Sequence, residues 1–242
     1  MSAEALVSDV AIPLMSLADD DLAVGHILTS VAGFGPELEI NIALSSMGQD
    51  ELGHARAFYI LAVGADRGSI NSAIFDRSAA EHGGATLSWL YAEEWERLLV
   101  KQYLFETADA ARRHVLSASP DADVDVRAAI ERMEGEEQYH IDFWTTWLER
   151  TLGHGADAVR RVQSALDEIW PHAPSLFDVP GVEVIVPGGL RDARAAWVVR
   201  TERVLASLGL TIPGGAPSPL ADDRSRVVDE LQYVRRAVPG SW

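Results

Sequence analysis

The sequence predicts an all-α protein, with a four-helix bundle followed by about three additional C-terminal helices. Long segments repeat apolar residues at helical spacing and end at glycine or proline, as helices that bury one face do. Strand-like composition is confined to one short run, residues 182–186. The chain has 242 residues, 48% of them hydrophobic, and is expected to form a single domain. The bundle is assigned to residues 14–152, and the additional helices and tail to residues 153–242.

Two long helices are expected at the start of the bundle. Residues 1–12 are interpreted as a short extension, and the first helix follows over residues 14–34. The sequence Gly33-Phe34-Gly35-Pro36 should end it, because glycine and proline interrupt helices and proline also fits the first turn of the next. The second helix is expected over residues 36–63. At 1.5 Å per residue it would be roughly 42 Å long, which suits a bundle.

A polar stretch separates this pair from the second pair. Residues 64–84 are expected to loop over one end of the bundle. The third helix is predicted over residues 85–117, and Ser119-Pro120-Asp121 should end it. The fourth is predicted over residues 124–152, with Gly153 as its C-terminal stop.

The C-terminal third of the chain is divided by proline and glycine clusters. A fifth helix is expected over residues 156–169, followed by a connection over residues 173–189. A sixth helix is expected over residues 190–208 and a last one over residues 224–237, with a linker at 211–219 between them. These three helices are interpreted as a cap or a partner-binding surface.

Composition and charge exclude several classes of partner. The net charge is −17, from 37 acidic and 20 basic side chains, so neither nucleic acid nor an anionic membrane is expected to bind. No run approaches the ~18 apolar residues of a membrane span. Residues 1–9 do not resemble a signal peptide, so a cytoplasmic location is expected. Because cysteine is absent, any metal must be held by oxygen and nitrogen ligands.

Two Glu-x-x-His motifs, Glu51 with His54 and Glu137 with His140, are the strongest functional signal. Residues three apart share one face of a helix, so each motif can present a carboxylate and an imidazole to one point. Each motif alone could also be ordinary, with a solvated Glu and a buried structural His. Together, in two long helices, they match the pattern of a dinuclear metal site inside a four-helix bundle.

That pattern requires one further carboxylate from each of the other two helices. Counting back 31 residues from Glu137 gives Glu106, and counting back 30 from Glu51 gives Asp21. Asp21 follows Asp19 and Asp20, and a run of three aspartates could instead mark a helix N-terminus. The predicted metal ligands are therefore Asp21, Glu51, His54, Glu106, Glu137 and His140, holding two iron ions or manganese.

The acidic residues just before each motif, Asp50 and Glu136, have a second predicted role. They point away from the metal face and could accept the outer N–H of a ligating histidine across helices, which would fix its ring. Ordinary helix-surface charge is the alternative. The other five histidines have no partner at ligand spacing, and no phosphate-binding loop, dinucleotide fingerprint or nucleophile elbow is found.

Three segments carry a resemblance to a known family. Residues 35–44, the motif Gly53-His54-Ala55-Arg56 and, most specifically, the tail at residues 230–242 resemble the C subunit of the ring-1,2-phenylacetyl-CoA epoxidase. The resemblance extends over nearly the whole chain. It implies a ferritin-like fold and a role in aerobic phenylacetate breakdown. It also implies a homologous catalytic A subunit with a di-iron centre, and a separate reductase that supplies electrons.

The sequence departs from the usual C subunit, which has Leu and Gln where this chain has Glu51 and His54. The stretch Gln-Asp-Glu-Leu-Gly-His instead resembles the A subunit. One hypothesis is therefore a di-iron oxygenase that activates O₂. The alternative is a non-catalytic scaffold subunit that binds an A-type partner, and iron storage or oxidation is a weaker third interpretation.

The expected partners follow from these hypotheses. Association as a homodimer or with an A-type subunit is predicted, with the seven Trp and the C-terminal segment offering apolar area. Phenylacetyl-CoA is the leading substrate. Because the acidic surface does not attract the anionic CoA group, a local basic patch would be needed, and the nearest candidates in sequence are Arg56, Lys101, Arg112 and Arg113.

Overall fold

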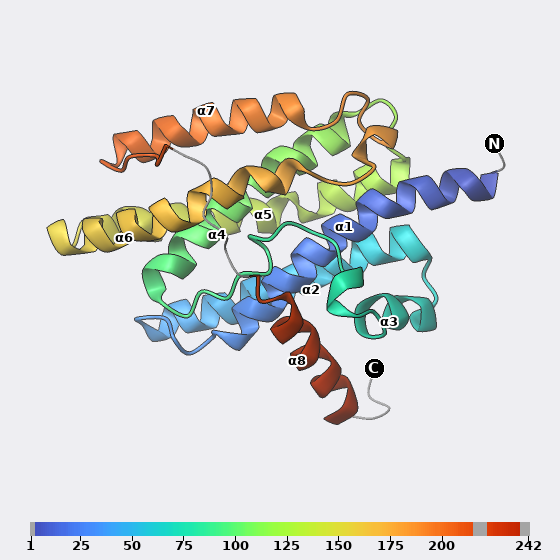
Figure 1. Cartoon of the computed structure of the whole chain (residues 1–242), viewed down its shortest axis with the longest axis horizontal. Helices are drawn as coiled ribbons and strands as arrows, with labels where there is room; N and C mark the ends of the chain where they lie inside the picture. Colours follow the sequence, from blue (N-terminus) through green and yellow to red (C-terminus); the bar gives the residue numbers. More distant parts are fainter. Residues whose placement is uncertain (1–2, 215–221, 238–242) are drawn as a thin grey trace.

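The computed structural model describes residues 3–214 and 222–237, and this part of the chain is helical without any strand (Figure 1). The all-α prediction is confirmed. The one strand-like run, residues 182–186, does not form a strand, because Val182–Val184 is a short 3₁₀ helix, η3. Within the described residues, no helix is both long and apolar enough to cross a membrane.

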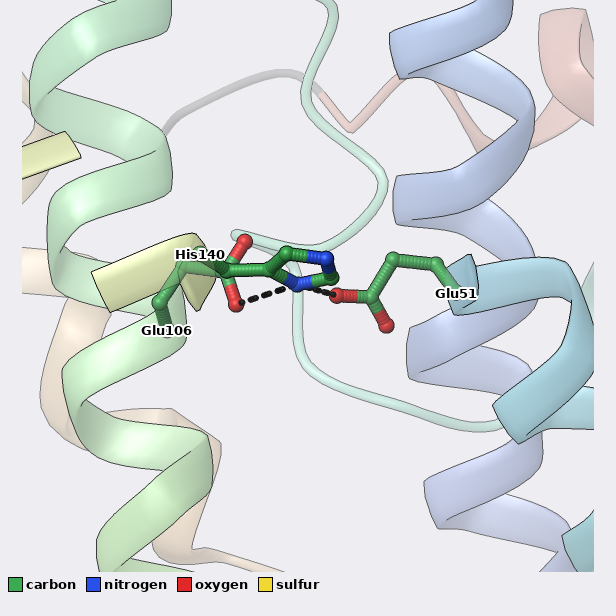
Figure 2. Close-up of side chains that lie close together, drawn as sticks. All are labelled: Glu51, Glu106 and His140. Atoms are coloured by element: carbon green, nitrogen blue, oxygen red, sulfur yellow. Dashed lines mark ion pairs between the residues drawn. The ribbon is translucent and has the colours of Figure 1, made fainter. Parts of the chain in front are cut away.

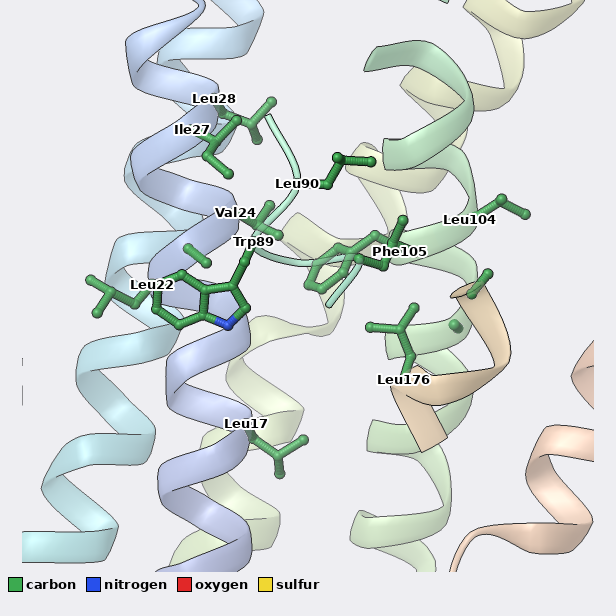
Figure 3. Close-up of a cluster of buried hydrophobic side chains, with 14 of the residues drawn as sticks. Leu17, Leu22, Val24, Ile27, Leu28, Trp89, Leu90, Leu104, Phe105 and Leu176 are labelled. Carbon is green, nitrogen blue, oxygen red and sulfur yellow. The ribbon is translucent and has the colours of Figure 1, made fainter. Parts of the chain in front are cut away.

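Four long helices form the predicted bundle: α1 (Ala3–Ser30), α2 (Leu38–Val63), α4 (Trp95–Ala118) and α5 (Val124–Leu152). The helices α1 and α2 run in opposite directions as one pair, α4 packs against α5 as the other, and α2 and α5 join the pairs (Figure 1). Apolar side chains fill the space between α1 and α4 (Figure 3).

The first helix is longer than expected. It begins at Ala3, so the prediction that residues 1–12 form an extension is wrong for the described residues 3–12. Pro13 lies inside α1, where its missing N–H removes one backbone hydrogen bond. Leu14 and Leu17, both about 1% exposed, anchor the following turns in the core.

The run Asp19-Asp20-Asp21 lies in the middle of α1, so the alternative that it marks a helix N-terminus is wrong. All three side chains are buried, and each pairs with an arginine from another element. Asp19 pairs with Arg77, Asp20 with Arg112, and Asp21 with Arg113. The acidic run is therefore a row of buried ion pairs that ties α1 to α4 and to the segment after α2.

The stretch expected to loop over the bundle end contains structure of its own. A nine-residue helix, α3 (Arg67–Phe75), is capped at its N-terminus by Asp66, whose side chain accepts a hydrogen bond from the Ser69 N–H. Ile70 and Ala73 bury its inner face. A short 3₁₀ helix, η1 (Ala79–Glu81), follows. The prediction of a plain loop over residues 64–84 is thus wrong, because α3 is too short for its periodicity to stand out.

The third bundle helix begins at Trp95, ten residues later than predicted. Two aspartates distant in sequence accept hydrogen bonds from backbone N–H groups of the segment at residues 85–94. Asp20 accepts from the Ala85 N–H, and Asp223 from the Tyr91 N–H. Trp89 nevertheless lies in the core beside α1, and its indole N–H donates to the Gly83 carbonyl (Figure 3).

The additional helices are α6 (Ala156–Ile169), α7 (Arg191–Ser207) and α8 (Arg224–Ala237), close to their predicted bounds. The first two cover α4, whereas α8 lies across the other side near α1 and α3 (Figure 1). Between α6 and α7, the 3₁₀ helix η2 (Trp170–Phe177) stacks Trp170 on Trp197 of α7, with ring centroids 5.4 Å apart. Among the residues that the structure describes, four tryptophans are buried, so the expectation that they offer interface area is wrong for Trp89, Trp144, Trp170 and Trp197.

The buried amine of Lys101, on α4, should make the stability of the fold depend on pH. Its side chain is fully buried, donates to the Ser88 carbonyl at 3.2 Å, and burial lowers the pKa of its amine from 10.5 to about 7. Between these pH values the unfolded chain binds a proton that the folded chain does not. Lys101 should therefore contribute a term to the free energy of unfolding that rises with pH, by up to about 1.4 kcal/mol per unit. Between pH 7.5 and 9.5 the free energy of unfolding, measured with urea, should change more favourably in the wild type than in Lys101→Met; equal pH dependence would contradict this.

Candidate metal centre

Five of the six predicted ligands converge in the bundle core. Glu51 and His54 lie one turn apart on α2, Glu137 and His140 one turn apart on α5, and Glu106 on α4. All five are buried, although glutamate is almost never fully buried unless it is paired. The i, i+3 spacing places each Glu and His on the inward face of its helix, as the sequence pattern indicated.

One cluster combines Glu51, Glu106 and His140, each from a different helix (Figure 2). The Nδ1 atom of His140 lies 3.3 Å from Glu51 Oε1 and 3.6 Å from Glu106 Oε2. The three ligating atoms lie within 4.8 Å of one another, close enough to share a metal ion. We call this the Glu106 position.

A second cluster combines Glu51, His54 and Glu137. The Nδ1 atom of His54 lies 3.5 Å from Glu51 Oε2 and 3.0 Å from Glu137 Oε1. We call this the Glu137 position. Glu51 contributes one carboxylate oxygen to each position, as a bridging carboxylate does. Glu106 belongs to one cluster only, so the structure offers Glu51, rather than Glu106, as the shared side chain.

The outer nitrogen of each histidine faces a carboxylate from the opposite helix. His54 Nε2 lies 2.8 Å from Glu136 Oε2, and His140 Nε2 lies 3.4 Å from Asp50 Oδ2. A carboxylate in this place fixes the ring and leaves Nδ1 directed at the cluster.

The sixth predicted ligand, Asp21, belongs to neither cluster. It is buried and lies 3.0 Å from the guanidinium of Arg113, which also contacts Glu137 at 2.7 Å. Arg113 is the residue that sequence reasoning missed as part of this site. The signal was present, because Arg113 follows Glu106 by seven residues and seven residues make about two helical turns. Both side chains therefore leave α4 on the same face.

Burial and mutual contact shift the pKa values of the cluster. Burial, reinforced by the neighbouring Glu51, raises the pKa of Glu106 to about 8. Burial alone would lower the pKa of both histidines, but the adjacent carboxylates raise it to about 11 for His54 and about 12 for His140. The same two histidines lower the pKa of Glu51 against the effect of burial. The carboxylates thus attract positive charge, which protons provide in the absence of a metal.

The donor set fits a metal ion. Among the described residues, neither oxygen of Glu51 nor of Glu106 has a hydrogen-bond donor in suitable geometry, although all four atoms are buried. Buried polar atoms normally have a partner, so these acceptors are exceptions that need an explanation. Carboxylate and imidazole ligands without thiolate suit iron and manganese.

The predicted basic patch for a CoA group is not formed. Lys101, Arg112 and Arg113 are buried, and only Arg56 of the four candidates is exposed. The error arose because position in sequence does not distinguish an arginine that binds solvent from one that pairs with Asp20 or Asp21 inside the bundle.

Fold and cluster together define a class, namely helical-bundle proteins with a buried carboxylate–histidine cluster suited to a metal ion. The family model described as "Phenylacetic acid catabolic protein" matches residues 3–242, and the chain belongs to this family. A similar protein is the C subunit of the 1,2-phenylacetyl-CoA epoxidase of Escherichia coli (strain K12). It is 28% identical over 240 residues, which cover 93% of this chain and 96% of that protein. The family resemblance noted in the sequence is confirmed.

Proposed function

We propose that this chain is a metal-binding subunit of a phenylacetyl-CoA epoxidase-type complex and that it activates O₂ at iron held by the two clusters. The shared position of Glu51 is the observation that carries the proposal. Its two oxygens face two different histidines, at 3.3 and 3.5 Å, inside a fully buried site. A scaffold has no need of such a costly arrangement, because buried carboxylates without cations are destabilising.

The residues have distinct roles in this proposal. Glu106 and His140 complete one position, and His54 and Glu137 complete the other. Asp50 and Glu136 orient the two imidazoles from outside. Iron bound there would supply electrons to O₂, and the apolar bundle core would exclude water from the reaction. Asp21, which pairs with Arg113 outside both clusters, is kept only as a sixth candidate ligand.

Substrate and partners are proposed from the relative. That protein is the C subunit of a 1,2-phenylacetyl-CoA epoxidase, so an aromatic CoA thioester and a heteromeric assembly with an A-type subunit and a reductase are the leading candidates here. A homodimer is the alternative assembly. The predicted tail at residues 238–242 lies outside the described residues, so its part in assembly stays a prediction.

A scaffold role is the second candidate function, and one observation favours it. The similarity to a C subunit extends over nearly the whole chain. In that case the clusters would be structural, and the chemistry would occur in the partner.

Iron loading tests the proposal. The wild-type chain, loaded anaerobically with Fe²⁺ and freed of excess metal, should retain iron that O₂ then oxidises. In His140→Ala this oxidation, followed in the optical spectrum, should be at least about tenfold slower, because the Glu106 position loses a ligand. Glu134→Ala, an exposed Glu on the same helix, is the matched control and should behave as wild type. Equal oxidation rates in wild type and His140→Ala would exclude the catalytic role and leave the scaffold role.

A further inference from the structure

The two metal positions are not equivalent, because one of them already contacts a permanent cation. At the Glu137 position, Arg113 Nη1 lies 2.7 Å from Glu137 Oε1 and 3.4 Å from His54 Nδ1, and Nη2 lies 4.0 Å from Glu51 Oε2. The guanidinium thus contacts one ligating atom of every residue in that cluster. At the Glu106 position, within the described residues, Glu106 forms no ion pair with any Lys or Arg.

Arg113 is held firmly in this place. Its Nε atom contacts Asp109 one turn away on α4, and its Nη2 atom lies 3.0 Å from Asp21 of α1. The guanidinium also lies over the Phe58 ring, 5.5 Å from the centroid. It remains charged, since the surrounding carboxylates, opposing the effect of burial, hold the pKa of Arg113 well above its ordinary value.

A metal ion and this guanidinium require the same atoms. Arginine is a hydrogen-bond donor only, so its N–H groups face the lone pairs that a metal ion would use. Bonds to carboxylate oxygen and imidazole nitrogen are about 2.0–2.2 Å long for an ion such as Zn²⁺. An ion at such distances from His54 and Glu137 would lie against Arg113, and two like charges this close in a buried site repel strongly.

We propose that Arg113 competes with a metal ion for the Glu137 position, so that the two positions fill in order, with the Glu106 position first. This inference rests on the proposed function, since it assumes that the clusters bind metal. In this proposal Asp21 and Asp109 position the guanidinium of Arg113. They hold the guanidinium beside the Glu137 position, and they keep it paired when a second ion displaces it from Glu137.

Titration of the metal-free full-length chain with Mn²⁺ tests the order of filling. Electron paramagnetic resonance distinguishes one isolated Mn²⁺ from a coupled pair, and the free ion is measured directly. In the wild type, the first equivalent should give the isolated signal, and a second ion should bind at least tenfold more weakly or not at all. In Arg113→Gln the second ion should bind at least tenfold more tightly than in the wild type, with a coupled signal.

Arg77→Gln is the matched control. Arg77 is partly buried and also pairs with an aspartate of α1, Asp19, but it contacts neither cluster. Its replacement should leave the affinity for the second Mn²⁺ as low as in the wild type. If Arg113→Gln does not fold, the wild-type titration still decides the order of filling, and Arg113→Lys, which keeps a charge but not the planar fork, gives a second comparison.

The outcomes separate the two claims. Two results would overturn the proposed competition without contradicting metal binding itself. One is a coupled Mn²⁺ pair at the first additions to the wild type, and the other is an affinity for the second ion that Arg113→Gln does not change. No Mn²⁺ retained by either the wild type or Arg113→Gln overturns the metal-binding function itself, and the competition with it.

Discussion

Replacing Glu51 with Gln should weaken metal binding at both positions, lowering the affinity for Mn²⁺ or Fe²⁺ by on the order of 100-fold or more. Glu51 is the one side chain that the two clusters share. Loss of a group that merely orients a ligand costs about 10–100-fold in metal affinity, so loss of a shared ligand should cost at least the upper end of that range. Metal analysis after desalting, together with the metal-induced shift in melting temperature, measures this effect.

The stability of the metal-free variant is measured beside its metal affinity. Because Glu51 faces the buried imidazoles of His54 and His140, which lower its pKa, removing its charge should lower the free energy of unfolding of the metal-free protein. Glu39→Gln, an exposed position near the start of the same helix, is the control and should change neither quantity. A Glu51→Gln variant that binds metal as the wild type does would contradict the shared-ligand assignment.

The bundle was predictable because its signals are local. Apolar periodicity and glycine or proline breaks fixed the four long helices and the three C-terminal ones within a few residues, apart from two helix starts. The start of α4 depends on contacts with residues distant in sequence, and the start of α1 depends on a helix that continues through a proline. Asp20 and Asp223 hold residues 85–94 out of α4, and α1 continues through Pro13. Neither effect is visible in the residues of the segment concerned.

The site was only partly predictable, for a different reason. The Glu-x-x-His spacing can be recognised within a single helix. It therefore identified four residues that the structure brings together, namely Glu51, His54, Glu137 and His140. The contacts of Arg113 depend instead on how α4 faces α1 and α5. The sequence showed Arg113 as one basic residue among several, and only packing places its guanidinium between Asp21 and Glu137.

The catalytic and scaffold roles differ in how the assembled complex should respond when a ligand of the Glu106 position is removed. His140 is fully buried and completes that position. In the complex purified with its natural partners, His140→Ala should lower O₂-dependent turnover of phenylacetyl-CoA by at least about 100-fold if this chain holds the reacting metal, since a direct ligand is lost. Assembly should be unaffected, because the side chain lies inside the bundle.

His154→Ala is the control for this experiment, since His154 is exposed in the turn between α5 and α6 and belongs to neither cluster. It should retain wild-type turnover. Size-exclusion chromatography of each complex separates a loss of chemistry from a loss of assembly. If His140→Ala forms an intact complex with unchanged turnover, the reacting metal belongs to the partner. Glu51, Glu106 and His140 then serve the stability of this protein, and its contribution to the reaction is to hold that partner in place.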